Sequence, residues 1–378
     1  MSHSILFVAS LHHPEQLLTE WEGIPEGIPR PLFPTSLRQH YLERAMLRRG
    51  YRLDVFWRNL PGFGPQDIHR LQAERFREGM TPQKVTQALL RRLPARANPD
   101  LRQRNAALLK KAEQFRPEIV WVVGDNTVIY PETLATLKQR YGCKIVYATG
   151  VSPIVFAGKL ERDAAPLYDL VLVNDFYHGI QWLELGAKQA ECLPLSAIDP
   201  DFHKPQVLSD AEKAAFACDV TFVGTLLPAH LYGERVEALN ALTDVDLGLW
   251  SVHDAPASLK PYLRGSALGR EMFRVLSGAT ISLNVHGNFM RYGGNMRLFE
   301  AAGVGAFQIS DERPGIHEWF TVGEHLVTYN DLDDLHAKVQ YYLAHPDERE
   351  QIARAGREHA LKHHTYEQRL DAIEVLLG

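Results

Sequence analysis

Short runs of β-branched and aromatic residues alternate with longer helix-like segments along almost the whole chain, and this order constrains the fold more than any other feature. Such a βα order is typical of parallel sheets with helices on both faces. The sequence therefore predicts an α/β fold with Rossmann-like units. We expect strands at residues 5–8, 51–56, 119–123, 144–147, 170–173, 191–193, 220–223, 247–250, 281–285, 306–309 and 326–329.

The length of 378 residues exceeds what one hydrophobic core usually supports, so two domains are expected. Residues 196–205 contain two prolines and show no apolar period, as is typical of a linker. We therefore expect an N-terminal Rossmann-like domain over 1–200 and a second one over 201–360. A terminal helix over 361–378 can pack back on the N-terminal domain.

Composition excludes several classes of protein. The net charge is −5 without long runs of either sign, so no nucleic-acid partner is expected. The longest apolar runs have five or six residues, whereas a membrane-spanning helix needs about 20, so any membrane association is peripheral. The start of the chain lacks the basic region of a signal peptide. The three cysteines form no CxxC pattern, which fits the reducing cytoplasm.

Candidate binding residues follow the strands, because open parallel sheets bind ligands beyond the carboxyl ends of their strands. In the C-terminal half, one strand leads through Gly293 and Gly294 directly into a helix, a pattern typical of a phosphate cradle. Asn295 can cap this helix, Arg297 adds a positive charge, and Glu300 can accept hydrogen bonds from ribose hydroxyls. Two alternatives stay open: the glycine pair is only a turn, and Glu300 is only a solvated helix residue.

Three further places in the C-terminal half fit the same ligand. Gly224 and Thr225 follow a strand, and Arg235 lies on the next helix. A backbone amide of this loop and the Arg235 guanidinium can reach a diphosphate. The alternative for Arg235 is an ordinary surface position. Trp250 ends a strand and can wall a base pocket or belong to the core. His286 can donate to a phosphate or a sugar hydroxyl, with a structural histidine as the alternative.

The N-terminal half offers polar residues in corresponding places. Ser10 and His12 follow the first strand, Asp125 follows the strand at 119–123, and Thr149 follows the next one. A carboxylate in that position can deprotonate an acceptor hydroxyl, or it can cap the next helix. Asp125 and, in the other half, His286 are the candidates for catalytic residues.

No metal site is expected. The acidic pairs at Asp199 and Asp201, at 244 and 246, and at 333 and 334 fall in turns or at a helix start, and no HExxH pattern occurs. A leaving diphosphate would instead be stabilised by main-chain amides, the helix dipole, Arg297 and Arg235.

Several segments carry a family resemblance: NMRLFEAAGVGAFQISD, GIHEWF, LVTYNDLDDL and the helical stretch beginning YYLAHPDEREQ. Together they resemble the C-terminal domain of CgeB-like (spore maturation type) glycosyltransferases, relatives of the family 4 glycosyltransferases. The resemblance covers about 220–370, and residues 169–205 resemble the end of the N-terminal domain of such proteins. It implies the GT-B fold, in which two Rossmann-like domains face each other across a cleft.

The resemblance also implies roles for the two halves. The C-terminal domain would hold a UDP-, GDP- or dTDP-linked sugar and the N-terminal domain a glycan or glycoconjugate acceptor, with no prosthetic group. Glu300 stands at the final motif glutamate, which is expected to hold the donor ribose. The broader family has another glutamate eight positions earlier, where this chain has Tyr292, so a different contact with the transferred sugar is expected there. Thr149 precedes a position at which many relatives are acidic.

The resulting expectation is a metal-independent glycosyltransferase of polysaccharide or glycoconjugate assembly, with a lean towards retention of anomeric configuration. Tyr292 in place of the earlier glutamate, together with Asp125 as a possible base, keeps inversion open. It would lie in the cytoplasm or at the inner face of the membrane. A nucleotide-sugar epimerase of the same fold and a non-catalytic nucleotide-sugar-binding protein stay open as alternatives. A dinucleotide oxidoreductase is disfavoured, because no GxGxxG follows the first strand.

Overall fold

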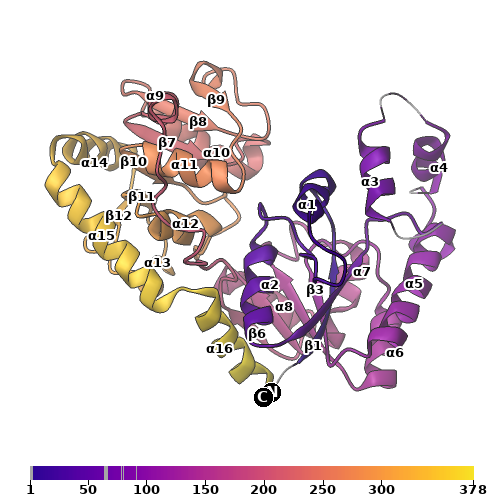
Figure 1. Cartoon of the computed structure of the whole chain (residues 1–378). Helices are drawn as coiled ribbons and strands as arrows, with labels where there is room; N and C mark the ends of the chain where they lie inside the picture. Colours follow the sequence, from indigo (N-terminus) through magenta and orange to yellow (C-terminus); the bar gives the residue numbers. More distant parts are fainter. Residues whose placement is uncertain (1–2, 64–66, 78, 80, 91) are drawn as a thin grey trace. The chain divides into compact units, whose positions relative to one another are not determined.

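The computed structural model describes residues 3–63, 67–77, 79, 81–90 and 92–378, and the chain divides into two compact units. The first comprises Met1–Val173 and His178–Cys192, and the second comprises Asn174–Tyr177 and Leu193–Leu376. Each unit contains one six-stranded sheet covered by helices, and its strands pair in parallel (Figure 1). The predicted α/β fold class is confirmed.

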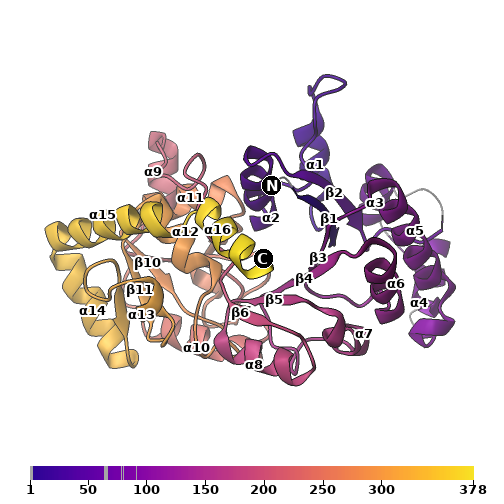
Figure 2. The ribbon, with the colours of Figure 1, turned by 90° about the horizontal axis from the view of Figure 1, so that it is seen from below.

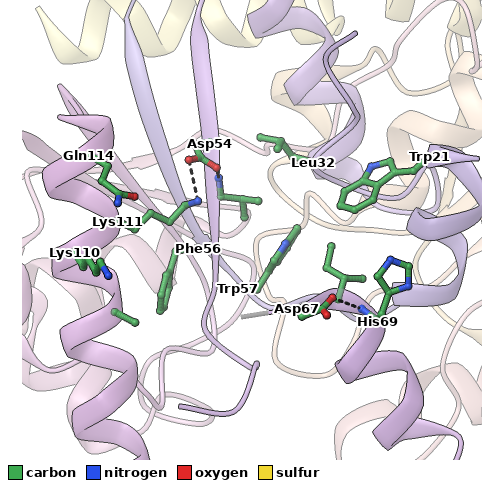
Figure 3. A pocket seen from close by; sticks show the side chains of 13 residues that line it. Trp21, Leu32, Asp54, Phe56, Trp57, Asp67, His69, Lys110, Lys111 and Gln114 are labelled. Carbon is green, nitrogen blue, oxygen red and sulfur yellow. Dashed lines mark hydrogen bonds and ion pairs between the residues drawn. The ribbon is translucent and has the colours of Figure 1, made fainter. Parts of the chain in front are cut away.

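The sheet of the first unit has the strand order β2-β1-β3-β4-β5-β6, so β2 is an edge strand. Its open edge lines a cavity, shown in Figure 3. The strands are β1 (Ser4–Ala9), β2 (Arg52–Trp57), β3 (Ile119–Val123), β4 (Lys144–Thr149), β5 (Leu170–Val173) and β6 (Ala190–Cys192). The helices are α1 (Pro14–Trp21), α2 (Arg38–Arg48), α3 (Ile68–Arg75), α4 (Pro82–Leu90), α5 (Pro99–Phe115), α6 (Pro131–Tyr141), α7 (Lys159–Asp163) and α8 (Phe176–Glu184), with short 3-10 turns η1 (Ala95–Ala97) and η2 (Ala165–Leu167).

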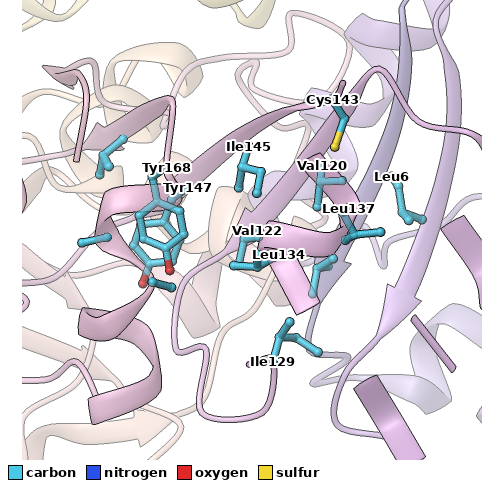
Figure 4. Packing of buried hydrophobic residues seen from close by; sticks show 14 of the residues in the cluster. Leu6, Val120, Val122, Ile129, Leu134, Leu137, Cys143, Ile145, Tyr147 and Tyr168 are labelled. Carbon is cyan, nitrogen blue, oxygen red and sulfur yellow. The ribbon is translucent and has the colours of Figure 1, made fainter. Parts of the chain in front are cut away.

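The first core lies between the sheet and the helices α5 and α6, and α2 covers the opposite face (Figure 2). Leu134 and Leu137 of α6 pack on Val120 of β3 in one buried cluster (Figure 4). At the other end of this cluster the rings of Tyr147 and Tyr168 stack with centroids 4.5 Å apart. Alternate strand residues therefore face the helices, and the carboxyl ends of the strands stay free for loops.

The sheet of the second unit has the order β12-β11-β10-β7-β8-β9. Leu239 of α10 and Leu335 of α14 join one core cluster with the strand residue Leu283, while α11 and α12 cover the other face. The strands are β7 (Val220–Val223), β8 (Leu247–Trp250), β9 (Leu263–Gly265), β10 (Ile281–Asn284), β11 (Gln308–Asp311) and β12 (Val327–Tyr329). The helices are α9 (Asp210–Phe216), α10 (Ala229–Asn240), α11 (Arg270–Gly278), α12 (Met296–Val304), α13 (Ile316–Trp319), α14 (Leu332–Ala344), α15 (Pro346–His363) and α16 (Tyr366–Leu377), with the 3-10 turn η3 (Lys260–Tyr262).

The structure differs from the expected elements in a few places. Helix α2 begins at Arg38 after Leu37, which provides no side-chain cap. The helices α1, α3 and α4 and the strand β9 lie where the sequence predicted none. Helices α15 and α16 are separate near the C-terminus. Thr365 caps α16, because its hydroxyl accepts from the backbone N–H of Gln368 at 3.4 Å in a capping box. Residues 196–205, the predicted linker, belong to the second unit.

In the part of the chain that the structure describes, no helix has the length and apolar content to cross a membrane. Among the described residues, none of the three cysteines forms a disulfide bond. Burial raises the pKa of the Cys143 and Cys218 thiols to about 11 each, so both stay protonated at neutral pH.

The junction of α15 and α16 predicts a loss of stability in acid. His364 is buried with Nε2 2.7 Å from the Trp319 carbonyl, and burial together with the charge of Arg369 lowers the pKa of His364 to about 3. As pH falls below about 6.5, His364 takes up a proton in the unfolded chain but stays neutral in the folded chain. The free energy of unfolding should therefore fall by up to about 1.4 kcal/mol per pH unit.

Urea unfolding at pH 7.5, 6 and 5 would measure this slope. In His364→Gln the slope should shrink, whereas His317→Gln, at a largely exposed side chain, should keep the wild-type slope. Equal slopes in wild type and His364→Gln would contradict the assignment.

Candidate functional site

A glycine pair forms the loop that enters α12. Gly293 and Gly294 have φ values of 110° and 93°, a backbone region that other residues rarely adopt. A Cβ atom on Gly294 would lie 2.5 Å from the Asn174 carbonyl oxygen and 2.7 Å from the Trp319 ring. Asn295 is the N-cap, and its Oδ1 accepts from the backbone of Leu298 at 3.1 Å, as the sequence predicts. The loop thus brings bare backbone to a helix N-terminus, where partial positive charge favours an anion.

Arg297 and Glu300 form a buried ion pair one turn further along α12. The guanidinium Nη1 lies 2.7 Å from Glu300 Oε2, Nη1 also contacts the Met272 sulfur, and Nη2 donates to the Val223 carbonyl at 3.3 Å. Burial lowers the pKa of Arg297, and the charge of Glu300 opposes that shift. Glu300 is 7% exposed, so it is not a solvated helix residue.

His286 lies beside the glycine loop and is fully buried. Its Nδ1 lies 2.7 Å from Asp311 Oδ1, and its backbone N–H donates to the same oxygen at 3.1 Å. Nε2 has no hydrogen-bond partner among the described residues, and a Cβ atom built on Gly293 would lie 3.6 Å from it. The free side of the imidazole is therefore directed at the loop.

Asp311 is a site residue to which the sequence analysis gave no role. Its other oxygen, Oδ2, accepts from Arg313 Nε at 2.9 Å, and Arg313 Nη2 in turn donates to Glu234 at 2.5 Å. Burial alone would raise the pKa of Asp311, but His286 and Arg313 outweigh it and the pKa lies below its usual range. Asp311 is the last residue of β11, the neighbour of β10. Because ligands bind beyond the carboxyl ends of parallel strands, its position at a strand end is the signal that could have indicated it.

Arg235 joins the loops that follow β7 and β10. Its Nε donates to the Val285 carbonyl and its Nη1 to the Thr225 carbonyl, each at 2.8 Å. Burial lowers the pKa of this guanidinium to about 10. Gly224 extends the same edge, with its N–H donating to the Trp250 carbonyl at 3.0 Å. Arg235 is thus neither a plain surface residue nor free of protein contacts.

The two remaining candidates of this half lie in aromatic surroundings. The Trp250 ring is 4% exposed, packs edge-on against Phe216 and lies under the Arg264 guanidinium at 5.6 Å. These are contacts of a core residue, the alternative that the sequence left open. The Tyr292 backbone N–H donates to Asp175 at 2.7 Å, and its hydroxyl donates to Glu318.

A cavity of about 170 Å³ in the first unit brings together all four residues predicted for the acceptor side, Ser10, His12, Asp125 and Thr149. A larger cavity of about 510 Å³ shares Ser10 and Asp125 with it. Four loops that are distant in sequence therefore meet at one sheet edge, as the parallel topology requires.

Asp125 does not cap the following helix, which was its alternative use. The N-cap of α6 is Tyr130, and Asn126 rather than Asp125 holds the intervening turn, accepting from Ile129 at 2.8 Å. Among the described residues, none donates a hydrogen bond to the exposed Asp125 carboxylate. Asp125 also has φ +63°, a strained value for a residue with a side chain.

Arg58, which the sequence analysis missed, lines both cavities. It is 2% exposed and donates to the carbonyls of Val8 at 3.2 Å, Val123 and Gly124. Burial lowers the pKa of Arg58 to about 10, against the charge of Asp125. Arg58 directly follows β2, so its position after a strand is the signal that points to it.

Within the described ranges, no group of three or more His, Cys, Asp or Glu side chains is arranged to hold a metal ion. The acidic pairs noted in the sequence are engaged with the protein itself. Asp199 accepts from the backbone of Asp201 at 3.0 Å, Asp244 contacts His336 at 2.7 Å, and Asp246 contacts Arg264 at 2.5 Å.

Comparison with known proteins gives the site its class. Residues 228–375 match the sequence model of a family described as glycosyl transferase-like. This match covers less than half of the chain, so it shows that residues 228–375 are similar to that family. No curated protein matches the chain.

Solved structures extend the likeness over the whole chain. HepE from Anabaena, in complex with UDP and glucose, is 14% identical, with 99% of both chains covered and a TM-score of 0.59. Sucrose-phosphate synthase from Thermosynechococcus elongatus is 15% identical, with 99% and 98% covered and a TM-score of 0.62. A glycosyltransferase from Rickettsia africae is 11% identical, with 99% and 98% covered and a TM-score of 0.59.

These matches confirm the predicted GT-B fold and, through the matching domain, the predicted enzyme class, glycosyltransferase. The CgeB-like subtype stays a prediction.

The glycine loop predicts an unequal effect of two alanine substitutions. Gly294→Ala places a methyl group against Asn174 and Trp319 at a positive φ, whereas Gly323→Ala has a similar φ of 84° and nothing within 4 Å. Both should lose about 1–2 kcal/mol of stability from backbone strain, and Gly294→Ala should lose more. Urea unfolding measures both, and an equal loss would show that the loop can move away from Asn174.

Proposed function

We propose that the protein is a metal-independent glycosyltransferase that moves a sugar from a nucleotide-sugar donor to a hydroxyl of a glycan or glycoconjugate acceptor. The observation that carries the proposal is the edge of the second sheet, where the Gly293–Gly294 loop, the unpartnered Nε2 of His286 and the buried Glu300 surround one helix N-terminus. This combination suits a diphosphate and a ribose together.

The donor would lie with its diphosphate on the backbone N–H groups of the glycine loop and the start of α12. Arg297 Nη1 lies 2.7 Å from Glu300 Oε2 and holds this carboxylate in place, and a carboxylate can accept hydrogen bonds from the two ribose hydroxyls. Because this pair has no net charge, the diphosphate would depend on backbone amides and the helix dipole. UDP-, GDP- and dTDP-sugars all fit, and the UDP and UDP-glucose complexes of HepE favour testing uridine first.

The acceptor would lie in the 170 Å³ cavity of the first unit. Asp125 is its candidate base, because its carboxylate is exposed and accepts no hydrogen bond from the described residues. Ser10, His12 and Thr149 would orient the acceptor hydroxyls. The reacting proton would pass from the acceptor hydroxyl to Asp125 as that oxygen attacks the anomeric carbon and the nucleoside diphosphate leaves.

The family resemblance leans towards retention, whereas a direct displacement with Asp125 as base would invert the anomeric configuration, so the anomer of the product decides between the two. No prosthetic group is needed for this reaction, and the cytoplasm or the inner face of a membrane is the proposed location. An epimerase of the same fold would need acid and base groups on both faces of the sugar. A non-catalytic nucleotide-sugar-binding protein would have no use for a base, so the free Asp125 carboxylate favours transfer over both.

A thermal-shift panel of UDP-, GDP-, dTDP-, ADP- and CMP-linked sugars, with and without EDTA, tests the donor site. A ligand that binds only the folded chain at 100 times its dissociation constant stabilises it by about 2.7 kcal/mol. One base should raise the melting temperature equally with and without EDTA. A shift that EDTA abolishes would contradict metal independence, and no shift with any donor would contradict the donor site.

Glu300→Gln identifies the residue behind this binding. The amide is similar in size, but it accepts ribose hydrogen bonds less strongly and leaves the buried Arg297 without its counter-charge. Donor affinity should fall about tenfold or more, which is about 1.4 kcal/mol per factor of ten. Glu271→Gln, at an exposed position of α11, is the matched control and should bind like wild type. Unchanged affinity of folded Glu300→Gln would remove Glu300 from the site.

Asp125→Asn tests the base. Asparagine tolerates the left-handed backbone that Asp125 adopts, so the loop should keep its shape. The transfer rate should fall about 10²- to 10⁴-fold, the usual contribution of a general base, while donor binding should stay as in wild type. Asp163→Asn, at the exposed end of α7, should leave both quantities unchanged. Full transfer activity in Asp125→Asn would show that another group takes the proton.

A further inference from the structure

A separate cavity of about 520 Å³ runs along the open edge of β2 in the first unit (Figure 3). All of residues 54–57 line it, so it follows the strand itself. Helix α5 closes one side with Lys110, Lys111 and Gln114, and Trp21 and His69 contribute from α1 and α3. We call it the β2-edge cavity. None of its residues belongs to the donor or acceptor sites described above.

The lining of the β2-edge cavity combines aromatic rings with charged and amide groups. Trp21, Trp57 and His69 gather at one end, and Asp54, Lys111 and Gln114 lie at the other (Figure 3). The Trp21 indole N–H donates to the Pro31 carbonyl at 2.7 Å, so the ring is held in place before any ligand arrives. Sugars suit such a lining, because their C–H faces pack on aromatic rings while carboxylates and amides bind their hydroxyls.

The β2-edge cavity adjoins the acceptor cavity through one pair of rings. Trp57 lines the β2-edge cavity and Phe33 lines the 170 Å³ cavity. These two rings pack edge to face, with centroids 5.3 Å apart. The next residue after Trp57 is Arg58, which lines the acceptor cavity. The two cavities therefore lie on either side of this buried pair of rings, and a chain molecule whose reacting end lies near Asp125 would pass around the rings to reach the β2-edge cavity.

We propose that the β2-edge cavity binds the non-reacting sugars of an acceptor glycan, which makes the acceptor an oligosaccharide or longer chain. The proposal rests on the proposed function for the position of the reacting end. The ion pair between Lys111 Nζ and Asp54 Oδ2, 2.9 Å apart, holds the carboxylate that would meet the sugar hydroxyls.

A peptide added as a further strand is the competing occupant of an open sheet edge. The backbone N–H groups of Arg52 and Arg58 point towards β1, where they donate hydrogen bonds. Successive N–H groups of a strand point to opposite sides, and Val55 is an odd number of residues from both. The N–H of Val55 therefore faces the open edge. Asp54 Oδ1 already accepts from this N–H at 2.7 Å. The central donor that a peptide strand would need is thus occupied, and the structure favours a glycan.

The test titrates the full chain with gluco-, galacto-, manno- and xylo-oligosaccharides of one to eight sugars, followed by saturation-transfer NMR and tryptophan fluorescence. In at least one series the affinity should rise about tenfold or more with chain length. Trp21→Ala should abolish this rise, and Trp21→Phe, which keeps an aromatic ring, should restore part of it. Gln114→Ala should weaken the long glycans several-fold, whereas the matched Glu113→Ala, exposed on the same helix outside the cavity, should not.

The outcomes separate this proposal from the proposed function. Glycan binding that does not depend on chain length, or that Trp21→Ala leaves unchanged, would overturn the proposal while leaving the donor and Asp125 tests intact. Binding of an extended Thr-Val repeat peptide at Trp21 without glycan binding would overturn it in favour of strand addition. A length dependence that Trp21→Ala removes would support the cavity even if no nucleotide-sugar stabilised the chain.

Discussion

The geometry of a parallel sheet is the constraint on which the rest of this structure depends. All strands of a parallel sheet end at the same edge, so the loops that leave them collect there regardless of their distance in sequence. In the first unit this edge gathers Ser10, Arg58, Asp125 and Thr149 around one cavity. In the second it brings the loops after β7 and β10 to the start of α12. In each half of the chain the polar side chains therefore gather at the sheet edge, and the core between sheet and helices stays apolar.

Both edges are held together by buried cations that donate to strand-end carbonyls. Arg58 does this in the first unit, and Arg235 and Arg297 do so in the second. Burial disfavours the charge of each, as their lowered pKa values show. Carbonyl oxygens and the carboxylates of Asp125 and Glu300 offset that cost. These arginines therefore stabilise the loops at the strand ends, and they are less available to a ligand's phosphates than their charge alone suggests.

The sequence predicted the fold, the glycine loop and four residues that line the 170 Å³ cavity of the first unit, because these follow from periodicity and from position after a strand. It could not predict the partners that those residues find. Asp311 contacts His286 because β10 and β11 are neighbouring strands. The order of strands in a sheet cannot be predicted from local sequence patterns. For Trp250 the position at the end of a strand was not sufficient to predict a binding role, because a side chain at a strand end can face the core instead of a ligand. The β2-edge cavity depends on the packing of α1, α3 and α5, two of which the sequence did not indicate.

The pairing of His286 with Asp311 decides what the imidazole can offer a donor. Because Asp311 accepts from Nδ1, a neutral His286 carries its proton there and presents Nε2 as an acceptor, which suits a sugar hydroxyl but repels a phosphate oxygen. Arg313 Nε donates to the other oxygen of Asp311 at 2.9 Å, so the carboxylate that orients the imidazole is itself held in place. In the proposed donor complex a hydroxyl of the transferred sugar would therefore lie at Nε2 of His286, and the diphosphate would lie at the backbone amides of the glycine loop.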